Sequence, residues 1–247
     1  MTQVKKLNAI LTFMRHGEKD DSGSLTLNGH HQAKRRGLKT EHLNGDVVLF
    51  HSGSVRVRNT IRTMAAHMHL SAEQEALLEL GEHVADYTVP SLHYLKDTKN
   101  TGDYFTHWDD IELTPENIQE RMDSFLDFGD TSTESSIYYS PEIMAKNIAK
   151  IIDTEINFAN LTDSKHRTNF INGSHEPVLT AFIGYFLSDY EAVSAGLIKT
   201  IGGPIDFAES FDIYIWQIGR DDFEIEFNFR GIKKLLDVAA LRQFIHS

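Results

Sequence analysis

Three short, largely apolar segments restrict the fold of this 247-residue chain most strongly. Each is followed by small or charged residues and then by a pattern typical of a helix. They are residues 7–14, 47–50 and 170–174. Short, largely apolar runs of this kind are typical of strands in a parallel sheet that is covered on both faces. The apolar residues that follow them recur with the 3.6-residue period of a helix. The sequence therefore predicts an α/β fold, with a mainly parallel sheet and helices on both of its faces.

Small residues mark one face of the helix expected after residue 26. Thr26 is a suitable N-cap, and Gly29, Ala33 and Gly37 recur every four residues. A stripe of small side chains permits close packing, so we expect this helix to lie tight against the sheet. The small residues then have a structural explanation, and we assign them no chemical role.

The last part of the chain predicts an antiparallel edge of the sheet. Residues 211–219 and 223–230 are typical of two strands joined by a short polar turn, that is, a hairpin. Residues 232–244 are expected to form a terminal helix. Earlier in the chain, residues 74–80 fit either a third strand or a helix end, because their periodicity does not distinguish the two.

Residues 85–136 interrupt this regular alternation. They mix Gly, Thr, Asp and aromatic residues without a period, and the segment is longer than a normal connection in a compact domain. We therefore expect a single domain over residues 1–247, with residues 85–136 forming an insertion or cap after the third strand. A short helix is expected within it, near residues 115–128.

Composition and charge narrow the class of function. The formal net charge of −12 argues against a nucleic-acid partner or an anionic membrane surface. The chain has no cysteine, which excludes disulfides, thiolate nucleophiles and cysteine-ligated metals. No stretch approaches the roughly 20 apolar residues of a membrane helix, and no secretory pattern is present. We expect a cytoplasmic protein and leave its oligomeric state open.

Three clusters of polar residues each follow a predicted strand and precede a helix. They lie at residues 15–18, 52–56 and 174–176, and a parallel sheet brings such positions to one edge. Together they supply two arginines, two histidines and the free amides of helix starts, which suit a phosphoryl group. A neutral imidazole can attack phosphorus, and guanidinium groups can stabilise the transition state. This chemistry requires neither a metal nor a cofactor.

At these residues the sequence resembles the histidine phosphatase superfamily, the phosphoglycerate-mutase-like group. Four motifs of that family occur in the family's order. They are Arg15-His16-Gly17 followed by Glu18; the Leu-Thr-x-x-Gly-x-x-Gln-Ala pattern from Leu25 to Ala33; an altered Ser-Ser-Pro-Leu-x-Arg stretch over residues 51–60; and the late His175. The alteration places His51 where the family has its first serine and Gly53 where it has proline.

The resemblance implies the roles of four residues. His16 would be the nucleophile, and Arg15, Arg56 and His175 would bind and stabilise the phosphoryl group. The implied activity is metal-independent hydrolysis of phosphomonoesters through a phosphohistidine. A phosphomutase is one alternative, although the residues after Gly17 do not match the mutase version of the motif. A non-catalytic module that binds phosphorylated ligands is the other, because residues 52–59 depart from the family pattern.

The resemblance offers three carboxylates as the acid that protonates the leaving oxygen. The mutase-related branch has a glutamate in a Leu-x-Glu context shortly after the third strand, and both Glu79 and Glu82 fit. The acid-phosphatase branch has an acid directly after the late histidine, where Glu176 lies. We expect Glu82 or Glu79 ahead of Glu176, whose carboxylate can instead interact with its helix N-terminus.

The acidic surroundings favour a small phosphorylated substrate over a polyanion, and a phosphoprotein is a further possibility. The motifs recognise only the phosphoryl group, which all candidate substrates share. We therefore expect the insertion at 85–136 to select the substrate, through aromatic side chains such as Tyr104 and Trp108.

Overall fold

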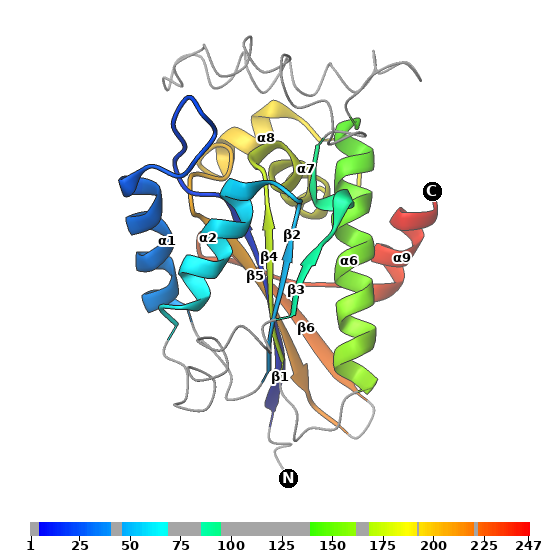
Figure 1. Ribbon diagram of the computed structural model, residues 1–247. Helices are drawn as coiled ribbons and strands as arrows, with labels where there is room; N and C mark the ends of the chain where they lie inside the picture. Colours follow the sequence, from blue (N-terminus) through cyan, green and yellow to red (C-terminus); the bar gives the residue numbers. More distant parts are fainter. Residues whose placement is uncertain are drawn as a thin grey trace.

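The computed structural model describes residues 5–40, 46–68, 85–94, 139–161, 168–191, 193–219 and 222–247. Within them, seven strands form one sheet in the order β3-β2-β4-β1-β5-β6-β7 (Figure 1). The strands are β1 (Lys6–Arg15), β2 (Asp46–His51), β3 (Ala85–Thr88), β4 (Thr168–Ser174), β5 (Ser210–Gln217), β6 (Phe223–Phe229) and β7 (Ile232–Leu235). The pairs from β3 to β1 are parallel, and those from β1 to β7 are antiparallel. The predicted α/β class, with its antiparallel edge, is confirmed.

Helices cover both faces of the sheet (Figure 1). On one face lie α1 (Leu27–Lys39) and α2 (Val55–Ala65), and on the other lie α6 (Pro141–Leu161), α7 (Glu176–Leu187) and α9 (Val238–His246). The 3₁₀ helix η1 (Pro90–Leu92) and the short helix α8 (Ala195–Thr200) complete the described elements. Among these, no helix combines the length and apolar character needed to cross a membrane.

Two hydrophobic cores hold the layers together. The larger core lies against α6, α7 and α9, and aromatic rings stack in it: Phe211 lies 5.0 Å from Phe13 and 5.4 Å from Phe182, between ring centroids. The smaller core joins Met14 and Leu49 of the sheet to the face of α2. Burial of each such side chain contributes roughly 1.5–3 kcal/mol. Side chains therefore pack on both faces of β1, which fixes the position of its C-terminal end.

Helix α1 begins as predicted but packs differently. The Thr26 hydroxyl caps it by accepting a hydrogen bond from the Gly29 N–H at 3.0 Å. Gly29 lies against the backbone of Glu18, and Gly37 lies against the Met64 carbonyl at the end of α2. The stripe of small residues is buried, but it permits close contact with a loop and a helix instead of the sheet.

The expected terminal helix over 232–244 is wrong in its first part. Residues 232–235 form β7, because Arg230 and Gly231 both adopt positive φ and close a two-residue hairpin turn. The helix α9 starts only after Asp237, whose carboxylate accepts hydrogen bonds from two helical N–H groups. Apolar spacing alone did not distinguish a short edge strand from a helix start.

The strand that pairs with β2 is β3, which lies where we expected the insertion to begin. Residues 74–80, for which a third strand was one of two expectations, lie outside the described residues. Residues 85–94 belong to the core, since Leu92 and Tyr94 are buried. The rest of the expected insertion, including the helix predicted near 115–128, lies outside the described residues.

Candidate active site

The ends of three parallel strands bring the predicted residues to one edge of the sheet. Arg15 ends β1 and pairs with Ser174 at the end of β4, and His51 ends β2 beside Gly173. The residues that follow these strands are therefore neighbours, although they are far apart in sequence. The His16 and His175 rings lie 5.4 Å apart, between centroids, in an edge-to-face arrangement.

The geometry of His16 fixes its tautomer. Its Nδ1 atom lies 2.8 Å from the Gly17 carbonyl oxygen, and because a carbonyl only accepts, Nδ1 carries the hydrogen. The other nitrogen, Nε2, therefore keeps its lone pair when the ring is neutral. Burial, followed by the charge of Arg56, lowers the pKa of His16 well below its ordinary value. At neutral pH the ring is thus uncharged, which is the form of imidazole that can act as a nucleophile.

The loop after His16 is hydrogen-bonded to α2 on one side and to the start of α1 on the other. The Gly17 N–H donates to the Thr60 hydroxyl at 3.0 Å, and that hydroxyl donates to the Arg56 carbonyl at 2.8 Å. The Glu18 carboxylate accepts hydrogen bonds from Asn28 and Thr26, both at 2.8 Å. These two bonds lower the pKa of Glu18, and the bond from Asn28 has the larger effect. Glu18 therefore ties the loop to the start of α1.

Arg15 is oriented by a segment that the sequence analysis did not identify. Its guanidinium donates to the Ile205 carbonyl at 2.9 Å and lies 3.9 Å above the Phe207 ring. The Ala208 N–H also donates to the His16 carbonyl, at 3.2 Å. Residues 205–209 thus form one wall of the site. No local motif marks them, because their role depends on contacts across the sheet edge.

His175 is held between two side chains of the second predicted cluster. The Ser52 hydroxyl lies 3.0 Å from His175 Nε2, and Arg56 Nη2 lies 3.5 Å from His175 Nδ1. Since a guanidinium only donates, Nδ1 accepts and Nε2 carries the hydrogen that points to Ser52. Burial, followed by the charges of His93 and Arg56, lowers the pKa of His175 well below its ordinary value.

The altered loop at residues 51–54 has a structural explanation. Gly53 adopts a φ of 86°, which proline cannot reach. The His51 ring stabilises this turn by accepting the Gly53 N–H at Nδ1, at 3.0 Å. The two departures from the family pattern are therefore coupled, and Ser52 and Arg56 still lie beside His175.

A third histidine, His93, joins the site. It is 3 % exposed, and its ring lies 4.5 Å from the His175 ring, edge to face. The Tyr94 ring packs against both, at 4.3 Å from His93 and 4.8 Å from His175. We had placed these residues in the insertion. No local signal marks them, because the four-residue strand ahead of them is too short to show a period.

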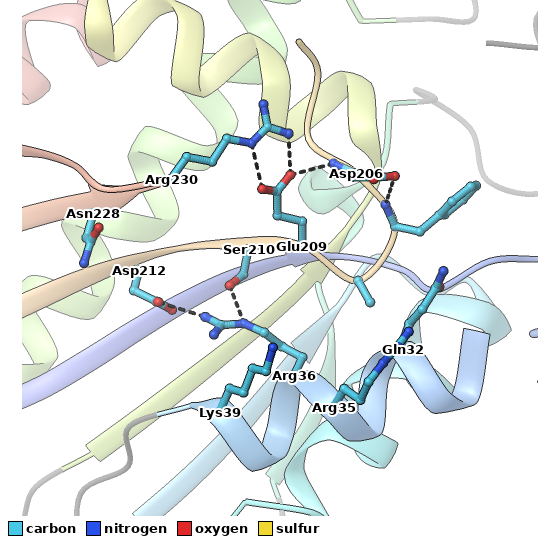
Figure 2. Close-up of a pocket in the computed structure, with 12 residues that line it drawn as sticks. Gln32, Arg35, Arg36, Lys39, Asp206, Glu209, Ser210, Asp212, Asn228 and Arg230 are labelled. Carbon is cyan, nitrogen blue, oxygen red and sulfur yellow. Dashed lines mark hydrogen bonds and ion pairs between the residues drawn. The ribbon is translucent and has the colours of Figure 1, made fainter. Parts of the chain in front are cut away.

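Two arginines brace the 205–209 wall from behind, where a cavity of about 530 Å³ lies between α1 and the sheet (Figure 2). Arg36 donates to Ser210 and to the carboxylate of Asp212, each at 2.8 Å. Arg230 binds both carboxylate oxygens of Glu209, at 2.7 and 2.6 Å. Such bidentate pairs restrict geometry strongly. The segment that orients Arg15 is therefore fixed on both flanks.

Of the three candidate acids, Glu176 is the one among the described residues. It is the first residue of α7 and is buried. Glu79 and Glu82 lie outside the described residues. Within the described ranges, no group of three or more His, Asp or Glu side chains is arranged to hold a metal ion.

Comparison with solved structures shows the same fold in several proteins. A mycobacterial hydrolase is 14 % identical, with a TM-score of 0.52 over 91 % of this chain and 99 % of its own. A second mycobacterial hydrolase is 13 % identical, with a TM-score of 0.52 over 98 % and 97 %. The mycobacterial glucosyl-3-phosphoglycerate phosphatase is 12 % identical, with a TM-score of 0.52 over 90 % and 98 %. No family model and no curated protein matches the sequence.

Proposed function

We propose that this chain, which has the histidine phosphatase fold expected from its motifs, is a metal-independent phosphomonoester hydrolase acting through a phosphohistidine on His16. The observation that carries the proposal is the hydrogen bond from His16 Nδ1 to the Gly17 carbonyl. It leaves Nε2 free as a nucleophile, with the cationic side chains of Arg15 and Arg56 beside it. A site that only binds phosphate has no need for such a tautomer.

The reaction has two steps. In the first, His16 Nε2 forms a bond to phosphorus, the bond from phosphorus to the ester oxygen breaks, and its electron pair leaves with that oxygen, which takes up a proton. In the second, water attacks the phosphohistidine and inorganic phosphate leaves, which restores the neutral ring. Because the nucleophile is already uncharged, no separate base is needed to activate it.

The surrounding cations stabilise the phosphoryl group as its charge shifts. Arg15 and Arg56 would bind the non-bridging oxygens, and the N–H of His175 would turn from Ser52 to a phosphoryl oxygen. The arginine side chains are held in place before substrate arrives, Arg15 by residues 205–209 and Arg56 at the start of α2. Charge is thus neutralised by groups of the protein, which is why a metal is not required.

A small phosphomonoester is the substrate class that we propose. The solved relative named glucosyl-3-phosphoglycerate phosphatase acts, by its name, on such a compound, and the acidic surface of this chain disfavours polyanions. Selection of the leaving alcohol by the expected insertion stays part of the proposal. Replacement of Tyr104 or Trp108 by alanine should then weaken activity on large leaving groups and spare p-nitrophenyl phosphate.

Hydrolysis of p-nitrophenyl phosphate in the presence of a chelator tests the reaction. The wild-type chain should release phosphate at an unchanged rate, and His16→Ala should lose activity by a factor on the order of 10³ or more. His67→Ala, just beyond the C-terminal end of α2, is the matched control and should remain active. Denatured enzyme from a stopped reaction should carry acid-labile phosphate on histidine.

Three outcomes would contradict the proposal. An active His16→Ala variant, or activity that the chelator abolishes, rejects the mechanism. Phosphoryl transfer between two positions of one substrate, without phosphate release, indicates a phosphomutase. Phosphate binding without any labelling of His16 indicates a non-catalytic binding module.

A further inference from the structure

Helix α1 is basic, although the protein is acidic. Residues 27–39 include Lys34, Arg35, Arg36 and Lys39 but no aspartate or glutamate, whereas the whole chain has a formal net charge of −12. None of the side chains proposed to attack or bind the phosphoryl group lies on this helix. The phosphoryl site therefore does not account for the positive charge of α1, and such a local cluster of cations attracts anions.

The cavity of about 530 Å³ behind the 205–209 wall lies directly against this helix (Figure 2). Its volume is that of a small-molecule site, and all of its lining residues except Phe207 and Ala208 are polar or charged. They are Gln32, Arg35, Arg36 and Lys39 from α1; residues 206–210 and Asp212 from the start of β5 and the loop before it; and Asn228 and Arg230 from the end of β6 and the turn after it. Such a lining suits a charged ligand.

Cations outnumber carboxylates in this lining, with four arginines and lysines against three acidic side chains. The two ion pairs described above, from Arg36 and Arg230, engage two of the carboxylates. The third carboxylate, that of Asp206, accepts the N–H of the next residue at 2.7 Å. The positive charges of Arg35 and Lys39 remain.

Several donors in the cavity have no acceptor within the described part of the protein. Arg35 and Lys39 make no hydrogen bond or ion pair there, and neither carries a dashed line in Figure 2. Arg36 uses its Nε and Nη2 atoms for the bonds described above, which leaves Nη1. The Gln32 carbonyl oxygen accepts the Glu18 N–H at 2.9 Å, so its amide group still has two hydrogens to donate. An anion in the cavity would accept from all four side chains.

These four side chains share one face of α1. Residues 32, 35, 36 and 39 follow the i, i+3, i+4, i+7 spacing of a helix face, over a length of about 10 Å. A guanidinium binds two oxygens of one oxyanion with its fork of N–H groups, whereas an ammonium binds as a point charge. Because Arg35 and Lys39 are exposed, salt and water weaken each contact with a singly charged ion. The arrangement therefore favours a compact ligand with two or more negative charges.

We propose that this cavity is a second anion site, separate from the candidate active site, and that it binds a compact polyvalent oxyanion such as a tricarboxylate or a diphosphate. Arg35, Lys39 and Arg36 would bind its oxygens, and Gln32 would donate from its side-chain amide. The Asn228 side chain lines the same cavity from β6. None of the residues in the proposed phosphatase mechanism takes part, so the site stands or falls independently of that mechanism.

Titration calorimetry at low ionic strength, with citrate and separately with pyrophosphate, tests the site. The wild-type chain should bind at least one of the two probes. The double variant Arg35→Gln/Lys39→Gln should bind it at least about tenfold more weakly, because both unpaired charges are lost. These positions are exposed, so the fold should be kept. The tighter probe identifies the ligand as a carboxylate or a phosphate.

A matched double variant separates a specific site from general attraction. Lys150→Gln/Lys199→Gln removes the same charge from exposed positions of α6 and α8 that do not line the cavity, and it should bind each probe as the wild type does. Equal weakening in both double variants would show that the anion responds only to net charge, and would overturn the proposal. A wild-type chain that binds neither probe would also overturn it.

The side-chain amides of Gln32 and Asn228 report where the anion binds. The bound probe should shift both of their ¹H–¹⁵N NMR signals in the wild type. The same shifts should occur in Arg56→Gln, which removes a cation of the candidate active site beside His175. If the probe binds but shifts neither signal, or if Arg56→Gln abolishes the shifts, the anion does not occupy this cavity independently and the proposal is wrong.

Discussion

A Cβ atom on Gly29 would lie 2.2 Å from the carbonyl oxygen of Glu18, so the start of α1 touches the loop after His16 backbone against backbone. The contact is mutual, since a Cβ on Gly17 would lie 2.6 Å from the Gly29 carbonyl oxygen. Because both contacts are with backbone atoms, no side chain can move aside to make room. The helix therefore acts as a rigid support for the peptide that fixes the tautomer of His16.

Gly29→Ala should disturb this support. The added methyl group must displace backbone, so we expect a loss of roughly 1–3 kcal/mol in the free energy of unfolding, together with reduced phosphatase activity. Urea denaturation and p-nitrophenyl phosphate hydrolysis measure the two effects. Gly196→Ala is the matched control, because its Cβ would meet only Ser194 Oγ, at 3.8 Å, at an exposed position of α8. Equal stability of the two variants would refute the argument.

Ser52→Ala should affect the orientation of the His175 ring more than the stability of the fold. Ser52 Oγ lies 3.0 Å from His175 Nε2 and both side chains are buried, so its removal frees the ring to rotate. We expect kcat to fall by about tenfold and stability to fall by about 1–3 kcal/mol. Ser188→Ala removes a hydroxyl bound to the Tyr185 carbonyl, away from the site. It should lower stability without lowering kcat; a parallel loss of activity there would indicate that stability alone explains both variants.

The placement of the candidate site residues could be predicted because it depends on local signals. A run of apolar residues that stops at Arg15, or at Ser174 before His175, marks the end of a strand, and parallel strands end at one edge. Neither signal requires knowledge of distant contacts. For the same reason the Thr26 cap was predicted correctly.

The parts that were missed depend on tertiary context. The strand β7 has only four residues and exists because it pairs with β6. Phe207 has a role only because the Arg15 guanidinium, at the end of β1, lies over its ring. His93 was assigned to an irregular segment, since the four-residue strand before it is too short to show a period.

The three buried histidines should make folding stability depend on pH. The folded state lowers the pKa of His16, His93 and His175, whereas in the unfolded chain each has a pKa near 6.5. Between these values the unfolded state binds more protons, so the contribution of these histidines to stability is fully present above about pH 6.5 and is lost as the pH is lowered toward 4. Urea denaturation from pH 7 to pH 4.5 should show this loss.

The variant His93→Gln isolates one of these groups. Because its folded pKa is about 4, the variant should lose less stability than the wild type on acidification, by up to about 3 kcal/mol at 1.36 kcal/mol per unit. Inorganic phosphate should raise the stability of the wild type, because it binds the folded state and not the unfolded chain. Parallel curves for the two proteins would show that the folded protein does not hold His93 neutral.

The last prediction concerns Glu155, a carboxyl group buried in the core between α6 and β4. It accepts a hydrogen bond from Asn172 Nδ2 at 3.1 Å, while Glu155 Oε1 and Asn172 Oδ1 have no hydrogen-bond partner in the described structure. Burial raises the pKa of Glu155 well above its ordinary value, so the folded state keeps the proton. The unfolded chain releases it above about pH 4.5, and stability is therefore lost as the pH rises.

Glu155→Gln should remove this loss of stability with rising pH. A glutamine has the same shape, can accept from Asn172 Nδ2, and can donate to Asn172 Oδ1, which satisfies both unpaired oxygens. The variant should be more stable than the wild type, and the difference should grow between pH 5 and pH 8 by at most about 1.4 kcal/mol per pH unit. Glu142→Gln, exposed on the same helix and paired with Lys146 at 2.7 Å, should change stability by less than about 1 kcal/mol at every pH. A constant difference in stability between Glu155→Gln and wild type across this range would mean that the buried group does not retain its proton. A variant less stable than the wild type would mean that a charged carboxylate is needed in the core.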